Sequence, residues 1–222
     1  PLILMDNKEF YLKLKNKQTE CLMKMGKFED ALRICTKALK IDPNNFQITV
    51  RTAQCYNFLN DNENAIVYLL KALEMNNNHR YNEYENLFGT IGDIFSEISQ
   101  EQSLKEREES ISNAILAYKK SMIFLNMSDN ADNKDFEDLQ YTNAMNLLKI
   151  GRSYMLIGKY IDALINLQMA NYINADMPTL QLTLSICYYY LDFVKESLMH
   201  FELIPIDELK EFKTLIPDLV EI

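Results

Sequence analysis

Residues 26–45 read Gly-Lys-Phe-Glu-Asp-Ala-Leu-Arg-Ile-Cys-Thr-Lys-Ala-Leu-Lys-Ile-Asp-Pro-Asn-Asn. This stretch is typical of a turn at Gly26, one amphipathic helix and a stop near Pro43. Apolar or small residues occupy positions 31, 34, 35, 38, 39 and 41, which share one side of a helix. The stretch therefore predicts a helix that buries one face against the rest of the chain.

The same pattern recurs along the chain. A shift of 34 residues brings Ala31 onto Ala65 and Ala38 onto Ala72. The small anchor residue appears five times, with spacings of 34, 49, 49 and 34, at Ala31, Ala65, Ala114, Ala163 and Ser197. A fixed period of this length indicates a repeat protein in which each unit buries its apolar face on its neighbours.

The repeat resembles the tetratricopeptide repeat, a unit of two helices in 34 residues. That family has small residues at repeat position 8, apolar or aromatic residues at position 11 and another small residue at position 20. Here position 8 is Thr19, Ala53, Gly92, Gly151 and Ser185, and position 11 is Leu22, Tyr56, Phe95, Tyr154 and Tyr188. The resemblance implies an all-α, right-handed superhelical solenoid of about five helical hairpins with a C-terminal capping helix.

The register divides the chain into three parts. Residues 1–11 are expected to be an N-terminal extension, residues 12–204 the repeat array, and residues 205–222 a capping segment. Within the array, the repeats start near 12, 46, 85, 144 and 178. The two long spacings place extra helix or loop at residues 100–107 and 129–143, where polar residues are frequent.

Composition excludes several classes of function. The formal net charge is -9 and the pI is near 4.8, so phosphate backbones and anionic lipids would be repelled; we expect neither nucleic acid nor membrane binding. The four cysteines form no C-x-x-C pair and the two histidines are isolated, so neither a metal nor another cofactor is expected. Unpaired, scattered cysteines favour a reducing compartment, and we expect a cytoplasmic protein.

The sequence also contains no recognisable catalytic motif. It contains no G-x-x-x-x-G-K, G-x-G-x-x-G or G-x-S-x-G motif. Neighbouring carboxylates such as Glu29 and Asp30 are typical of a solvated helix face, and cysteines at repeat position 10 are typical of buried small residues. We therefore expect a protein that is not an enzyme.

In tetratricopeptide arrays, the first helix of each unit lines the concave side of the superhelix. The resemblance implies a concave groove that is polar and basic near the N-terminus and apolar, with two cations, near the C-terminus. A peptide segment or a protein subunit bound there would place acidic groups on the cations and apolar anchors on the far end. The predicted contact residues are Lys13, Lys17, Arg51, Gln54, Phe58, Lys149, Arg152, Met155, Tyr189 and Tyr190.

One subset of the family binds the C-terminal carboxylate of heat-shock chaperones through a set of Lys, Asn and Arg residues. The match fails here, because Asn16 and Glu20 stand at the Lys and Asn positions of the first repeat, and Glu20 would repel a carboxylate. Chaperone-tail binding is therefore not expected. Two alternatives to a peptide-binding scaffold stay open: a helical regulatory domain of a larger enzyme or complex, and a self-associating module that forms a homo-oligomer.

Overall fold

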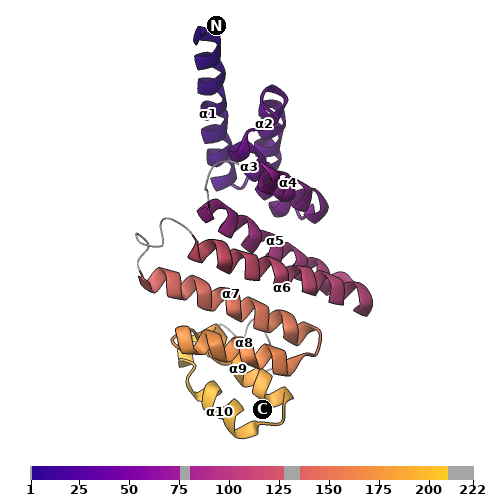
Figure 1. Ribbon diagram of the computed structural model, residues 1–222, viewed down its shortest axis with the longest axis vertical. Helices are drawn as coiled ribbons and strands as arrows, with labels where there is room; N and C mark the ends of the chain where they lie inside the picture. Colours follow the sequence, from indigo (N-terminus) through magenta and orange to yellow (C-terminus); the bar gives the residue numbers. More distant parts are fainter. Residues whose placement is uncertain (1, 76–80, 128–135, 210–222) are drawn as a thin grey trace. The chain divides into compact units, whose positions relative to one another are not determined.

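The computed structural model describes residues 2–75, 81–127 and 136–209, and every regular element within these ranges is an α-helix (Figure 1). The predicted all-α class is therefore confirmed. The helices are α1 (Leu2–Lys24), α2 (Phe28–Ile41), α3 (Phe46–Phe58), α4 (Asn62–Glu74), α5 (Tyr81–Glu101), α6 (Leu104–Asn126), α7 (Phe136–Leu156), α8 (Tyr160–Ile173), α9 (Pro178–Tyr190) and α10 (Val194–Glu202).

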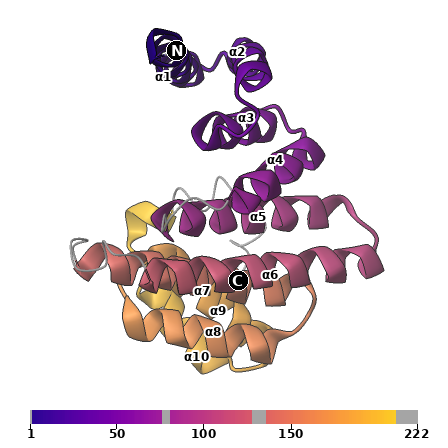
Figure 2. The ribbon, with the colours of Figure 1, turned by 45° about the horizontal axis from the view of Figure 1, so that its top comes forward.

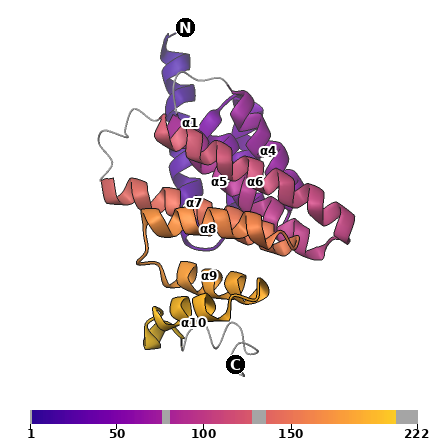
Figure 3. The same ribbon diagram turned by 60° about the horizontal axis from the view of Figure 1, so that its bottom comes forward.

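Successive helices pack in pairs as hairpins. We call the two helices of each hairpin its first and its second helix. The contacts group the chain into two compact units, unit 1 (residues 1–80) and unit 2 (residues 81–222). Unit 1 holds the pairs α1/α2 and α3/α4, and unit 2 holds α5/α6, α7/α8 and α9/α10. In Figure 2 the long helices α5, α6 and α7 run alongside one another, and Figure 3 shows α9 and α10 as the last pair.

Small residues stand where paired helices approach closely. Four of the five anchor residues are fully buried alanines, and Ser197 is 8% exposed. A Cβ added to Gly151 would lie 2.6 Å from Leu167, on the second helix of the same hairpin. The space between successive hairpins is filled by larger side chains, for example Leu148, Leu180 and Leu184 of one buried cluster in unit 2. The repeat register read from the sequence is thus the packing register of the structure.

The observed helices can be set beside three of the predicted boundaries. Residues 2–11 do not form a separate extension, because they are the first turns of α1, and Tyr11 packs against the buried cluster of unit 1. The polar residues 100–107 extend α5 and α6 and leave only a short turn at Gln102 and Ser103, where Ser103 and Glu106 form a capping box. Residues 128–135, which overlap the predicted insertion at 129–143, lie outside the described residues, and α7 begins at Phe136.

The predicted capping segment is described only in part. Helical backbone resumes at residues 206–209 after Pro205, and residues 210–222 lie outside the described residues. The capping role of this segment therefore stays a prediction.

Candidate functional site

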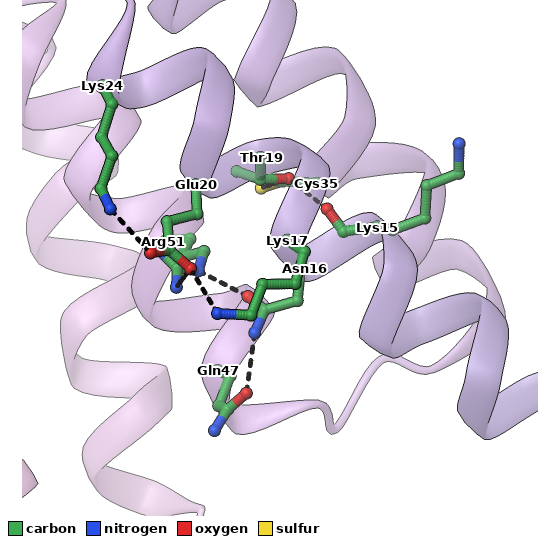
Figure 4. A network of polar contacts seen from close by, with 9 residues as sticks. All are labelled: Lys15, Asn16, Lys17, Thr19, Glu20, Lys24, Cys35, Gln47 and Arg51. Atoms are coloured by element: carbon green, nitrogen blue, oxygen red, sulfur yellow. Dashed lines mark hydrogen bonds and ion pairs between the residues drawn. The ribbon is translucent and has the colours of Figure 1, made fainter.

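In unit 1, the candidate site is a polar cluster that joins the two first helices, α1 and α3 (Figure 4). The Glu20 carboxylate forms ion pairs with three cations, with N–O distances of 3.2 Å to Lys17, 3.1 Å to Lys24 and 3.4 Å to Arg51. Lys17 and Lys24 are largely exposed, whereas about three quarters of the side chains of Glu20 and Arg51 are covered. Three cations around one carboxylate leave this patch positively charged in a chain of negative net charge.

Two amide side chains hold the geometry of this cluster. The Asn16 carbonyl accepts a hydrogen bond from Arg51 Nε, and its amide donates to Gln47 at 2.8 Å. Arg51 is thereby oriented from two sides, by Asn16 and by Glu20. Hydrogen bonds from Lys24 and Lys17 lower the pKa of the Glu20 carboxyl, which therefore stays ionised well below neutral pH.

The other predicted contacts of unit 1 lie around this cluster in different surroundings. Lys13 is exposed and pairs with Glu9 at 2.7 Å. Gln54 is half-buried on α3. Phe58 is 57% exposed, but its ring stacks on Phe28 with 4.5 Å between centroids, so it also packs α3 against α2.

In unit 2, a second polar group joins α5 to α7. Lys149 Nζ lies 2.8 Å from one Asp93 oxygen, and the Tyr118 hydroxyl donates to the same carboxylate at 2.8 Å. Lys149 also lies over the Tyr118 ring, 5.5 Å from its centroid. Burial and the nearby Asp93 raise the pKa of Tyr118, so this phenol stays protonated and donates at all physiological pH values. Arg152, one turn beyond Lys149, is exposed.

The apolar contacts predicted for unit 2 are only partly available to a ligand. Met155 packs against the buried cluster between α7, α8 and α9. Tyr190 stacks on Tyr160 with 4.8 Å between centroids, and Tyr189 meets Tyr190 edge to face at 6.1 Å. Tyr189 and Tyr190 nevertheless stay 50% and 58% exposed, so about half of each residue's surface is open to solvent.

Sequence reasoning missed that four of the predicted cations, Lys13, Lys17, Arg51 and Lys149, already have acidic partners. Glu20 and Asp93 stand at position 9 of one repeat, and Arg51 and Lys149 stand at position 6 of the next. Positions 9 and 6 of successive first helices therefore come within ion-pair distance. The recurrence of an acid at position 9 and a cation at position 6 is visible in the sequence, but the packing of successive repeats is needed to show that the two positions meet.

The described residues offer no sign of a metal centre or a reactive thiol. No group of three or more His, Cys, Asp or Glu side chains within them is placed to hold a metal ion. Cys35, Cys55 and Cys187 are fully buried, while Cys21 is exposed. Burial raises the pKa of Cys187 to about 11; a hydrogen bond with Cys55 lowers that of Cys35 to about 7, but this thiol has no exposed surface.

The described helices also bear on membrane insertion. Across residues 2–75, 81–127 and 136–209, none combines the length and the apolar character needed to span a bilayer.

Known proteins share this architecture. The sequence model of the tetratricopeptide repeat matches residues 22–86. MamA (41-end) from Desulfovibrio magneticus RS-1 superposes with a TM-score of 0.62 at 17% identity, over 91% of this chain and 97% of that chain. PilF of Pseudomonas aeruginosa gives 0.61 at 13% identity, over 89% and 76%. YrrB, described as a TPR protein with an unusual peptide-binding site, gives 0.59 at 14% identity, over 92% and 86%. At such identities the likeness concerns the fold.

Proposed function

Because the chain has the tetratricopeptide-repeat fold, with a sequence match to that family over residues 22–86, we propose that it is a non-catalytic scaffold that binds an acidic segment of a protein partner. The contact residues in this proposal lie on first helices of the repeats, on α1 and α3 in unit 1 and on α7 and α9 in unit 2. The same proposal places the protein in the cytoplasm, since a reducing compartment suits its unpaired cysteines.

The observation that carries this proposal is the excess of cations around Glu20. The Lys17 and Lys24 ammonium groups share one carboxylate, and their side chains are 76% and 75% exposed, so each keeps room for a second anionic partner. Because water screens the exposed Lys17 and Lys24 ends of these pairs, the pairs add little to stability, and exchanging them for pairs with a partner's carboxylates costs little. Several acidic side chains spread along a segment fit this surface better than a single terminal carboxylate, because the Arg51 guanidinium is already paired with Glu20.

Unit 2 supplies a matching contact set in the same proposal. Lys149 is held by Asp93 and stays 33% exposed, while Arg152 projects from the next turn of α7. Tyr189 and Tyr190 then offer apolar rings with polar tips, which are frequent anchors in protein interfaces.

The test compares baits. The wild-type chain and the Lys17→Glu/Lys24→Glu, Arg152→Glu and Tyr189→Ala variants are used to capture proteins, which mass spectrometry identifies. Lys37→Glu is the matched control, because Lys37 is an exposed cation on the second helix α2. We expect the three test variants to lose the same partner while Lys37→Glu and the helical signal stay unchanged. Undiminished capture by all three would contradict the proposed surface.

A further inference from the structure

Helix α8 is apolar on both of its sides, although only one side is buried. Ala163, Leu167 and Ala170 face the interior and are 0% exposed. The other side carries four large apolar residues at helical spacing, Ile161, Ile165, Met169 and Tyr172, which are 68%, 53%, 52% and 93% exposed. A helix at a protein surface normally presents polar residues to solvent on the side opposite its buried apolar stripe. The outer side of α8 is therefore a surface without a partner among the described residues.

The corresponding positions in the other described second helices are less apolar, although α4 has Val67 and α6 has Leu116 and Ile123 there, which are 59%, 53% and 55% exposed. On α2 the same four repeat positions hold Glu29, Arg33, Lys37 and Lys40, all exposed and charged. One repeat after α8, two of these positions hold Met199 and Leu203, which are 57% and 63% exposed. Among the described second helices, α8 carries large exposed apolar residues at all four positions, and its apolar surface continues onto the next repeat. We call this surface the outer ridge, comprising Ile161, Ile165, Met169, Tyr172, Met199 and Leu203.

The stacking of repeats does not account for the outer ridge. A following hairpin covers a different side of the second helix: on α8, Tyr160, Leu164 and Leu167 pack with the cluster that includes α9. Their equivalents 34 residues later, Val194, Leu198 and Phe201, form the terminal surface that the sequence after Pro205 is predicted to cover. That C-terminal sequence therefore already has another surface to cover.

We propose that the outer ridge binds an amphipathic helix of a protein partner. This helix carries basic residues beside its apolar face. The charges beside the ridge select this partner. Helices α8 and α10 together hold three carboxylates, Asp162, Glu196 and Glu202, against one cation, Lys195. All three carboxylates are exposed, and the whole chain has a net charge of -9. A second copy of the chain would bring the same acids into contact, whereas lysine or arginine side chains would pair with them.

Binding of two model peptides tests the proposal on the full chain. The probes are a fluorescein-labelled helical peptide, LKKLLKLLKKLLKL, and its glutamate counterpart, LEELLELLEELLEL, followed by fluorescence anisotropy. We expect the lysine peptide to bind and the glutamate peptide to bind at least tenfold more weakly. The double variant Ile165→Ser/Met169→Ser should weaken the lysine peptide about tenfold or more, because two large apolar contacts are lost. Asp162→Asn/Glu196→Gln/Glu202→Gln should weaken it as well and reduce its dependence on salt.

The control is Val67→Ser, since Val67 is 59% exposed at the same repeat position of α4. This variant should bind like the wild type, and circular dichroism should show unchanged helicity in every variant. If Ile165→Ser/Met169→Ser binds the lysine peptide as tightly as the wild type does, the proposal is overturned. A dimer in sedimentation velocity that this variant dissociates would do the same, because a second copy would then occupy the ridge. Phe212 and Leu215 belong to the predicted capping segment. Tighter peptide binding by Phe212→Ser/Leu215→Ser would also overturn the proposal, since this segment of the chain would then be the occupant.

Discussion

Two glycines one turn apart on α5 lie in different surroundings. A Cβ on Gly92 would lie 2.5 Å from the Tyr118 ring, whereas a Cβ on Gly89 would lie 3.7 Å from the Ser121 hydroxyl. Tyr118 is 2% exposed and its hydroxyl is bonded to Asp93, so the ring has nowhere to move. We expect Gly92→Ala to lower the free energy of unfolding by about 1–3 kcal/mol, and Gly89→Ala to raise it by up to about 1 kcal/mol. Urea denaturation followed by circular dichroism measures both, and equal effects would contradict the close approach.

The second prediction at this scale concerns His200. Burial lowers its pKa below the ordinary value of 6.5; its ring stacks on Tyr188, and Nδ1 lies 2.7 Å from the Gln181 carbonyl. The unfolded state therefore binds a proton more readily, and this contribution to stability is lost as pH falls through about 6.5 toward the folded pKa. We expect the melting temperature of the wild type to drop more between pH 7.5 and 5.5 than that of His200→Gln. Identical drops would show that the histidine titrates normally.

At the scale of single elements, the turn inside each of four hairpins contains one residue in the left-handed region. These residues are Gly26, Asn60, Gly158 and Asp192, with φ of 70°, 59°, 72° and 63°. They stand at the same repeat position, so the turn geometry is part of the repeat. A side chain costs about 1–2 kcal/mol in this conformation, less for Asn or Asp. We expect Asp192→Gly to stabilise unit 2 and Gly158→Ala to destabilise it by about 1 kcal/mol, as measured by thermal unfolding. A neutral or destabilising Asp192→Gly would contradict this account.

The same turns explain which parts of the fold the sequence could predict. Gly26 and Gly158 mark turns, and the alanine anchors mark close helix contacts; both follow from local sterics that recur with the period. The ends of the long helices were harder, because no turn residue separates residues 2–11 from the rest of α1. The pairing of Arg51 with Glu20 depends on how one repeat is placed on the next. The sequence predicted Arg51 as a ligand contact, but its ion pair required the packing of α3 on α1.

At the scale of the whole molecule, the packing divides at residue 80 into units 1 and 2. In repeat proteins, stability is approximately a sum of the repeats and their nearest-neighbour contacts, so damage need not spread along the chain. A destabilising change in one unit should then leave the backbone amides of the other unit protected from hydrogen exchange. This expectation differs from that for a single cooperative array, in which all hairpins would lose protection together.

Hydrogen exchange with mass spectrometry separates these cases. In Gly92→Ala, we expect faster exchange in peptides from α5 and α6 and unchanged exchange in peptides from α2 and α3. Ala65→Leu is the reciprocal variant: Ala65 is 0% exposed on α4, so the larger side chain overpacks unit 1. It should speed exchange in α3 and α4 and leave α7 and α8 unchanged. Each unit carries its own predicted contacts, with Arg51 in unit 1 and Arg152 in unit 2. If the units are independent, damage to one unit removes only the partner contacts of that unit. Faster exchange throughout the chain in either variant would contradict this independence.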